Sequence, residues 1–180
     1  MVVAWLRRVR PRTGALTAAA ALGAAIGLDR ATSRPHAKPA PPAPPTVLVM
    51  SGDCGGTHTR LMIHRIVAGL EPKEGHRVAG EEVLNRHYLN ASHDSFESVC
   101  RSFLAEAEPL TGGQRPAACC LAVAGAVDRT AAGGKVKFTN RETKGWSIDA
   151  AVLTRQLRIP RVRLINDFEA QVCYCRDCRC

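Results

Sequence analysis

Two apolar segments of strand type each run directly into a short polar motif, and this arrangement restricts the folds open to the chain. Residues 47–50 precede Gly-Asp-Cys-Gly-Gly-Thr at 52–57, and residues 162–165 precede Asn166 and Asp167. Polar groups at strand ends lie where sheet-based active sites form. The first motif is typical of a phosphate-holding turn. The second pairs an amide with a carboxylate that can orient a hydroxyl and accept its proton. Together they predict phosphoryl transfer to an alcohol.

The segments between the two motifs alternate in pattern between strand and helix. Strands are expected at residues 47–50, 61–67, 82–90, 117–124 and 162–165, and the first two flank the glycine turn as a hairpin. The run at 117–124 is continuously apolar, which is typical of a strand buried on both faces. With a further short strand before the last helix, the order is β-β-β-α-β-(β)-α-β. It predicts an α/β layered sheet that begins with an antiparallel hairpin.

Two amphipathic helices are expected between these strands. The first has apolar residues at 3.6-residue spacing from Phe96 to Ala107. Asp94 and Glu97 are placed as its capping box, and Pro109 with the following glycine pair is expected to end it. The second helix is expected over residues 148–157.

The composition supports one globular domain and argues against a nucleic-acid partner. The chain has 180 residues, 46% of them hydrophobic, which is ample for one core. Of its net charge of +9, residues 1–46 contribute +6, from seven Lys/Arg against Asp29, and the remainder contributes +3. Aromatic residues make up 4% of the chain, and no basic run is interleaved with them. The charge therefore belongs mostly to a leader.

Residues 1–46 are expected to be a targeting leader with a proline-rich linker. The leader has a basic start, an Ala-rich stretch at 15–28 that is too short for a confident membrane span, and prolines at 39–45. This composition favours import into a plastid or mitochondrion, while a secretory signal or an unprocessed cytosolic tail also fits it. Residues 47–170 then form the folded domain, and residues 171–180 form a cysteine-rich tail.

The glycine turn has the groups that a bound phosphate and its cation need. Gly55 and Gly56 lack a Cβ that would block the approach of a phosphate, and they can adopt positive φ. Asp53 can hold Mg²⁺ directly or through water, and Thr57 can donate a hydroxyl. The alternative is an ordinary hairpin turn.

Four motifs in the same order resemble those of bacterial-type glucokinases, in the superfamily of sugar kinases, actin and heat-shock ATPases. Residues 52–61, Gly-Asp-x-Gly-Gly-Thr-x-x-Arg-Leu, resemble the first phosphate motif of that family. Residues 121–127 are similar to its strand-and-turn element, and residues 136–140 with 146–149 are similar to its Thr-Asn and Trp segments. Residues 164–170 match its Asn-Asp-Phe signature.

The resemblance implies an N-terminal domain of the ribonuclease-H-like, actin-like ATPase fold and ATP-dependent phosphorylation of the glucose 6-hydroxyl, the entry step of glycolysis. Asp167 would be the general base, and Asn166 and Asn140 would contact the sugar. The turn residues would hold the ATP phosphates and Mg²⁺: Asp53, Gly55, Gly56 and Thr57. Two alternatives stay open: Asn166 and Asp167 can cap a helix that starts at Phe168, and Asn140 can be a turn residue.

The resemblance covers only the first of the two domains that such a kinase closes around its substrates. The second phosphate motif, the adenosine-binding segment and the Glu-Gly-Gly-His sugar element of the family have no match. We therefore expect this chain to phosphorylate glucose weakly or not at all by itself. The alternatives are a non-catalytic isoform that binds sugar weakly or pairs with a full-length subunit, and a kinase for another hexose. The sequence leaves the oligomeric state open, with a homo-oligomer among the options.

The remaining conspicuous residues have mainly structural interpretations. Arg60 can lie near a polyphosphate but fits a solvated or salt-bridged strand end, and Trp146 can line a sugar cleft but is more often a packing anchor. The internal cysteines 54, 100, 119 and 120 are typical of buried small hydrophobic residues. The cysteines at 173, 175, 178 and 180 fit no metal template, and the tail that holds them is expected not to be family sequence.

Overall fold

The computed structural model describes residues 44–69, 80–138 and 145–171. The predictions for the leader up to residue 43, for Asn140 and for the cysteines of the tail lie outside these residues.

A mixed five-stranded sheet with the order β3-β2-β1-β4-β7 forms the centre of the domain. Its strands are β1 (Thr46–Cys54), β2 (His58–Val67), β3 (Gly80–Leu89), β4 (Ala118–Val123) and β7 (Val162–Asn166). The first three strands pair antiparallel, while β4 pairs parallel with both β1 and β7. The predicted α/β sheet with an initial hairpin is therefore confirmed, and this strand order is that of the ribonuclease-H-like fold.

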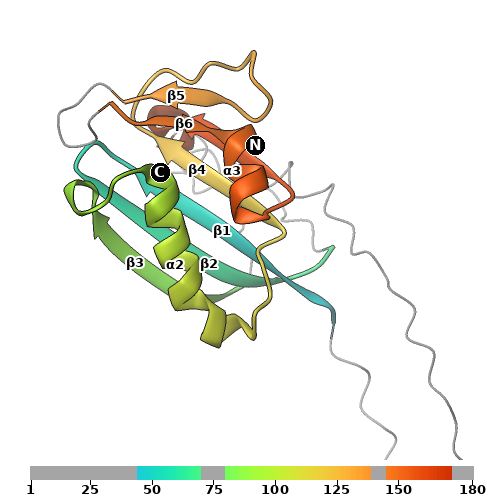
Figure 1. The fold of residues 1–180 in the computed structure, drawn as a ribbon. Coiled ribbons are helices and arrows are strands. Elements are labelled where there is room, and N and C mark those ends of the chain that lie inside the picture. Colours follow the sequence, from blue (N-terminus) through green and yellow to red (C-terminus); the bar gives the residue numbers. More distant parts are fainter. Residues whose placement is uncertain (1–43, 70–79, 139–144, 172–180) are drawn as a thin grey trace, which may run out of the picture.

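Two of the helices, α2 (Phe96–Thr111) and α3 (Ala150–Leu157), lie on the same face of the sheet (Figure 1). A core of buried apolar side chains fills the space between them and the strands. It includes Leu48, Met50, Leu61, Ile63, Phe96, Phe103, Leu121, Leu153 and Leu164. Every second residue of β1 faces this core, which is the period that the pleat of a strand imposes.

The first helix differs from its prediction at its N-cap and at Pro109, while the predicted glycine stop is confirmed. Its N-cap is Ser95, whose hydroxyl accepts the Ser98 N–H, and the Ser98 hydroxyl accepts the Ser95 N–H in return. The proposed box of Asp94 and Glu97 was therefore wrong by one residue. Pro109 lies inside the helix instead of ending it, so the helix continues past a residue that has no N–H to donate to the carbonyl of Ala105. The helix ends where Gly112 adopts φ 60°.

The second helix begins later than predicted. Ile148 belongs to the short strand β6 (Ser147–Asp149), which pairs antiparallel with β5 (Lys135–Lys137). Asp149 then caps α3, with its carboxylate accepting the N–H groups of Ala151 and Val152. The start at residue 148 was wrong because cross-strand pairing of Ile148 with Val136 replaces the first helical turn.

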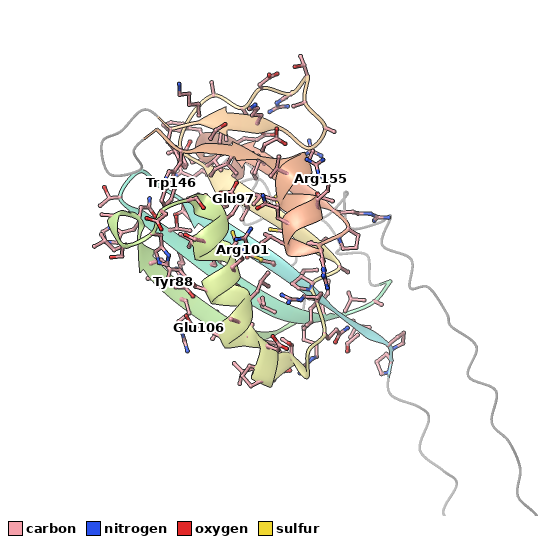
Figure 2. The ribbon with its side chains drawn as sticks, in the orientation of Figure 1. Tyr88, Glu97, Arg101, Glu106, Trp146 and Arg155 are labelled. Carbon is pink, nitrogen blue, oxygen red and sulfur yellow. The ribbon has the colours of Figure 1, made fainter. Side chains whose placement is uncertain are left out.

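The packing interpretation of the internal cysteines and of Trp146 is confirmed. The four cysteines are buried, and desolvation raises the pKa of the thiols of Cys54, Cys100 and Cys119. Trp146 is 7% exposed, and its Nε1–H donates to the carbonyl of Asp94 at 3.2 Å just before α2 (Figure 2). None of the helices within the described ranges is long and apolar enough to cross a membrane.

Candidate active site

The turn between β1 and β2 presents the residues of the first motif at the edge of the sheet. Gly55 N–H donates to the His58 carbonyl at 3.0 Å, which closes the turn. Asp53 and Thr57 are exposed, and Gly55 and Gly56 are half-buried. The motif therefore places a carboxylate, a hydroxyl and glycine backbone at the protein surface.

The structure places a steric requirement for glycine at a position of this motif that the sequence analysis did not select. Neither Gly55 nor Gly56 adopts the positive φ that the sequence permits. The position that requires a glycine for steric reasons is Gly52, where a Cβ would lie 2.6 Å from Leu61 Cδ2 and 2.8 Å from Leu121 Cδ2. The glycine at position 52 allows β1 to pack between β2 and β4.

Asn90 is a buried residue of this region that no pattern in the sequence singles out. It follows β3 and opens the short 3₁₀ helix η1 (Asn90–Ser92). Its side-chain Nδ2 donates to the carbonyls of Gly55 and Gly56, each at 2.9 Å. A single asparagine after a strand forms no recognisable sequence pattern. Its role becomes visible only through the hydrogen bond to Gly55, which lies 35 positions away in the sequence.

Asn166 and Asp167 combine a capping role with one free carboxylate oxygen. Both side chains accept the Phe168 N–H, Asn166 Oδ1 at 3.0 Å and Asp167 Oδ1 at 2.9 Å, where residues 167–171 begin a helix. The capping alternative is thus confirmed as a structural role. Asp167 Oδ2 has no partner among the residues that the structure describes, so this oxygen can accept the proton of a hydroxyl.

The parallel strands bring the two motifs to the same edge of the sheet. Cys54 pairs with Val123, and Val123 pairs with Asn166, so the carboxyl ends of β1, β4 and β7 are level. Two further bonds tie this edge together: Ala124 N–H donates to Cys54 O at 3.0 Å, and Asn166 Nδ2 donates to Gly125 O at 2.8 Å. Adjacent strands are about 4.8 Å apart, so the motifs are separated by ~10 Å.

The separation suits a transfer between two bound groups. A phosphate at the β1 turn and an alcohol at Asp167 would span the width of β4. The carboxylate of Asp53 is a hard oxygen donor with no hydrogen bond or ion pair to any described residue, so it fits Mg²⁺ held through water beside a phosphate. The arrangement can bind a polyphosphate at one end and activate a hydroxyl at the other.

Arg60 does not belong to this arrangement. It lies opposite Asp53 in the pairing of β1 with β2, but its Nε donates to Asn85 Oδ1 on β3 at 3.0 Å. The interpretation of Arg60 as a strand-end residue with a structural partner fits this contact.

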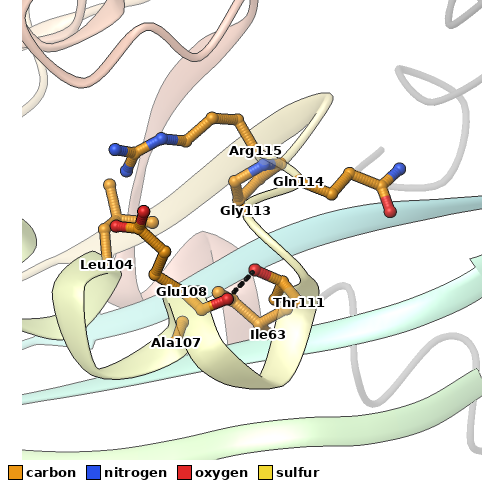
Figure 3. A pocket seen from close by; sticks show the side chains of 9 residues that line it. Ile63, Leu104, Ala107, Glu108, Thr111, Gly113, Gln114 and Arg115 are labelled. Carbon is orange, nitrogen blue, oxygen red and sulfur yellow. Dashed lines mark hydrogen bonds between the residues drawn. The ribbon is translucent and has the colours of Figure 1, made fainter.

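Two hollows outside the site do not include its residues. The one in Figure 3 lies where α2 ends, beside the loop that enters β4, and has a volume of about 10 Å³, room for a single water molecule. A larger one of about 240 Å³ lies along β7 and is lined by Arg129, Arg163 and glycines 133 and 134. Neither contains Asp167 or the residues of the β1 turn.

The strand order, the glycine turn after β1 and the carboxylate after β7 define an α/β domain of the ribonuclease-H-like, actin-like ATPase class. The chain belongs to the glucokinase family, because the family model described as Glucokinase matches residues 50–177. Curated glucokinases from two cyanobacteria are similar to it. The protein from Trichormus variabilis is 32% identical over 123 residues, and that from Nostoc punctiforme is 31% identical over 124 residues.

These alignments cover 68% of this chain but only 31% and 30% of the two relatives, so the chain spans about a third of their length. Among solved structures, a glucokinase from an Antarctic psychrotroph is 22% identical with a TM-score of 0.49, over 68% of this chain and 33% of that one. A glucokinase from Balamuthia mandrillaris in complex with glucose is 21% identical with a TM-score of 0.47, over 71% and 31%.

Proposed function

We propose that this domain takes part in ATP-dependent phosphorylation of glucose on its 6-hydroxyl. Membership of the glucokinase family supports the substrate pair, and one structural observation supports the chemistry. The glycine turn of β1 and the free oxygen of Asp167 lie at the same sheet edge, about 10 Å apart. Because the chain spans about a third of its relatives, the activity of a whole glucokinase is a proposal for it.

Asp167 is assigned the role of general base in this proposal. An alcohol is a poor nucleophile at neutral pH, and a carboxylate within hydrogen-bond reach accepts its proton as the phosphoryl group is transferred. The Phe168 N–H holds Oδ1 and so fixes the carboxylate, which leaves Oδ2 to face the hydroxyl. Asn166 has one amide hydrogen left after its bond to Gly125, and this hydrogen is assigned to a sugar oxygen. Asn140 is proposed as a further sugar contact.

The β1 turn is assigned to the phosphates of ATP. The backbone of Gly55, Gly56 and Thr57 and the Thr57 hydroxyl would contact them, and Asp53 would hold Mg²⁺ through water. When bound, the cation neutralises charge on the phosphates. The leader up to residue 46 is proposed to direct the protein to a plastid or mitochondrion.

The test is glucose-dependent release of ADP by the 180-residue chain, compared with two Asp→Asn variants. Asp167→Asn keeps the oxygen that accepts the Phe168 N–H but loses the base, and we expect turnover to fall by about 10²–10⁴-fold. Asp149→Asn is the matched control, since Asp149 also follows a strand and caps a helix but lies outside the site. It is expected to keep the activity of the unmodified chain.

Three results are informative. Activity that Asp167→Asn removes and Asp149→Asn leaves supports the proposal. Activity that survives Asp167→Asn overturns the role of that residue. No activity, together with saturable glucose binding measured by calorimetry, favours the second candidate, a non-catalytic fragment that binds sugar or pairs with a full-length subunit. The short span of the chain relative to its relatives is the observation that favours this candidate.

A further inference from the structure

Asn90 and Thr59 are the buried polar residues of the described chain, and they contact each other. Asn90 is 0% exposed and Thr59 is 1% exposed. The Thr59 hydroxyl donates to Asn90 Oδ1 at 2.8 Å, from the start of β2 to the end of β3. A buried side-chain amide must satisfy its groups within the protein, so the other partners of Asn90 indicate what it does.

Those partners are three successive carbonyls of the glycine turn. Nδ2 donates to the oxygens of Gly55 and Gly56, each at 2.9 Å, and the Asn90 backbone N–H donates to Thr57 O at 2.9 Å. Carbonyl oxygens only accept, and the Thr59 hydroxyl has Oδ1 as its acceptor. The orientation of the amide therefore follows from the network itself.

The inward carbonyls determine where the turn's N–H groups point. In a planar trans peptide, the C=O of one residue and the N–H of the next point in opposite directions. Because Gly55 O and Gly56 O face Asn90, the N–H groups of Gly56 and Thr57 face away from it. Neither N–H donates to any described residue. Two adjacent amides with this orientation present positive partial charge on the same side of the turn, which suits an anion.

We propose that Asn90 is the positioning residue of the phosphate turn, and that it holds the Gly56 and Thr57 amides ready for a polyphosphate. The choice of polyphosphate rests on the proposed function. The physical gain is preorganisation, since donors already fixed toward a charge need no rearrangement when it arrives. Without the hydrogen bonds from Asn90, each glycine peptide is free to rotate, and the N–H groups of Gly56 and Thr57 no longer point in the same direction.

The test follows the backbone amides of the 180-residue chain by NMR during titration with inorganic tripolyphosphate. Asn90→Asp is nearly isosteric and keeps the acceptor for Thr59, but its carboxylate cannot donate to the two carbonyls. Thr59→Val is the matched control, because it disturbs the same buried pair and leaves the Nδ2 donations intact. If Asn90→Asp does not fold, Asn90→Ser takes its place, since the serine side chain is too short to reach both carbonyls.

In the unmodified chain, the Gly56 and Thr57 amide signals are expected to shift and saturate with tripolyphosphate. The Asn90 variant is expected to bind it at least about tenfold more weakly, and Thr59→Val within about threefold of the unmodified chain. Equal weakening in both variants would mean general destabilisation and overturn the proposal. So would no shift of these amides, or unchanged binding in a folded Asn90 variant. Asn90-dependent binding in a chain that does not phosphorylate glucose would leave this inference standing and count against the proposed function.

Discussion

The turn after β1 and the end of β7 form the two halves of the candidate site, and they are held in opposite ways. The first is held by Asn90, a fully buried residue that follows β3 and whose amide donates to the carbonyls of Gly55 and Gly56. The second is held by its own neighbours, since the side chains of Asn166 and Asp167 accept the N–H of Phe168. Among the described residues, one further side-chain bond, from Asn166 to Gly125, reaches the turn after β4. The turn after β1 is therefore backbone held by a distant side chain, while the end of β7 presents a half-buried carboxylate whose Oδ2 has no partner among the described residues.

The two halves should differ most in how much unfolding free energy is lost when Asn90 or Asn166 is replaced by alanine. Asn90→Ala takes the hydrogen-bond partner from the part-buried carbonyls of Gly55 and Gly56 and from the buried Thr59 hydroxyl, and we expect a loss of about 3 kcal/mol of unfolding free energy. Asn166→Ala removes a cap at a solvent-accessible strand end, with an expected loss of about 1 kcal/mol. Urea unfolding of both variants measures this. Equal losses would contradict the contrast between the two halves.

A second prediction concerns the glycines of the β1 motif. Gly52→Ala places a Cβ against Leu61 and Leu121 between three strands, and we expect a loss of about 2 kcal/mol from overpacking. Gly55→Ala is the control within the same motif, because its Cβ would meet only the His58 carbonyl at 3.3 Å. It is expected to lose less than half as much stability. Thermal unfolding of both variants provides the measurement, and a larger loss for Gly55→Ala would assign the steric requirement to the turn rather than the strand.

The smallest expected effect concerns the support of β3, the strand that Asn90 follows. The Tyr88 hydroxyl donates to the Glu106 carboxylate on α2 at 2.8 Å, and Figure 2 labels both residues. The Arg86 Nε donates to the same carboxylate at 2.8 Å. The Tyr88 bond and then Arg86 lower the pKa of Glu106 below its ordinary value of 4.5, and burial followed by the Glu106 bond raises the pKa of Tyr88. We expect Tyr88→Phe to lose about 1 kcal/mol at neutral pH.

The same contact makes a pH prediction. A carboxylate with a depressed pKa in the folded state stabilises the protein above its unfolded-state pKa, and this contribution is lost as the pH falls through the folded-state value. The unmodified chain should therefore lose stability below about pH 4.5, and Tyr88→Phe should lose less over the same range. The midpoints of urea unfolding, measured from pH 7 to pH 3 for the unmodified chain and for Tyr88→Phe, test this. Glu108→Gln, which changes another glutamate of α2, is the control. Parallel pH curves for the unmodified chain and Tyr88→Phe would contradict the assignment.

The local patterns of the sequence predicted most of the fold and part of the site. The sheet strands, the presence of two helices and the positions of the two motifs follow from apolar periodicity and from polar residues at strand ends, which are properties of neighbouring residues. One error occurred where two neighbouring residues can each cap the same helix, and the other where a distant strand pairs with the start of a predicted helix. Ser95 rather than Asp94 caps α2, and Ile148 joins a strand because Val136 lies across from it.

What the sequence by itself determined is therefore the order of strands and helices, the family and the chemical groups at the two strand ends. The tertiary structure decided which of these groups meet. The pairing of β4 with both β1 and β7 places the motifs at one edge, and no local pattern encodes that register. Asn90 acquires its role in the same way, since its partners lie 31 to 35 positions away and become neighbours only when β3 pairs with β2. Buried hydrogen bonds between distant segments depend on the whole sheet, and a single polar residue in a sequence does not reveal them.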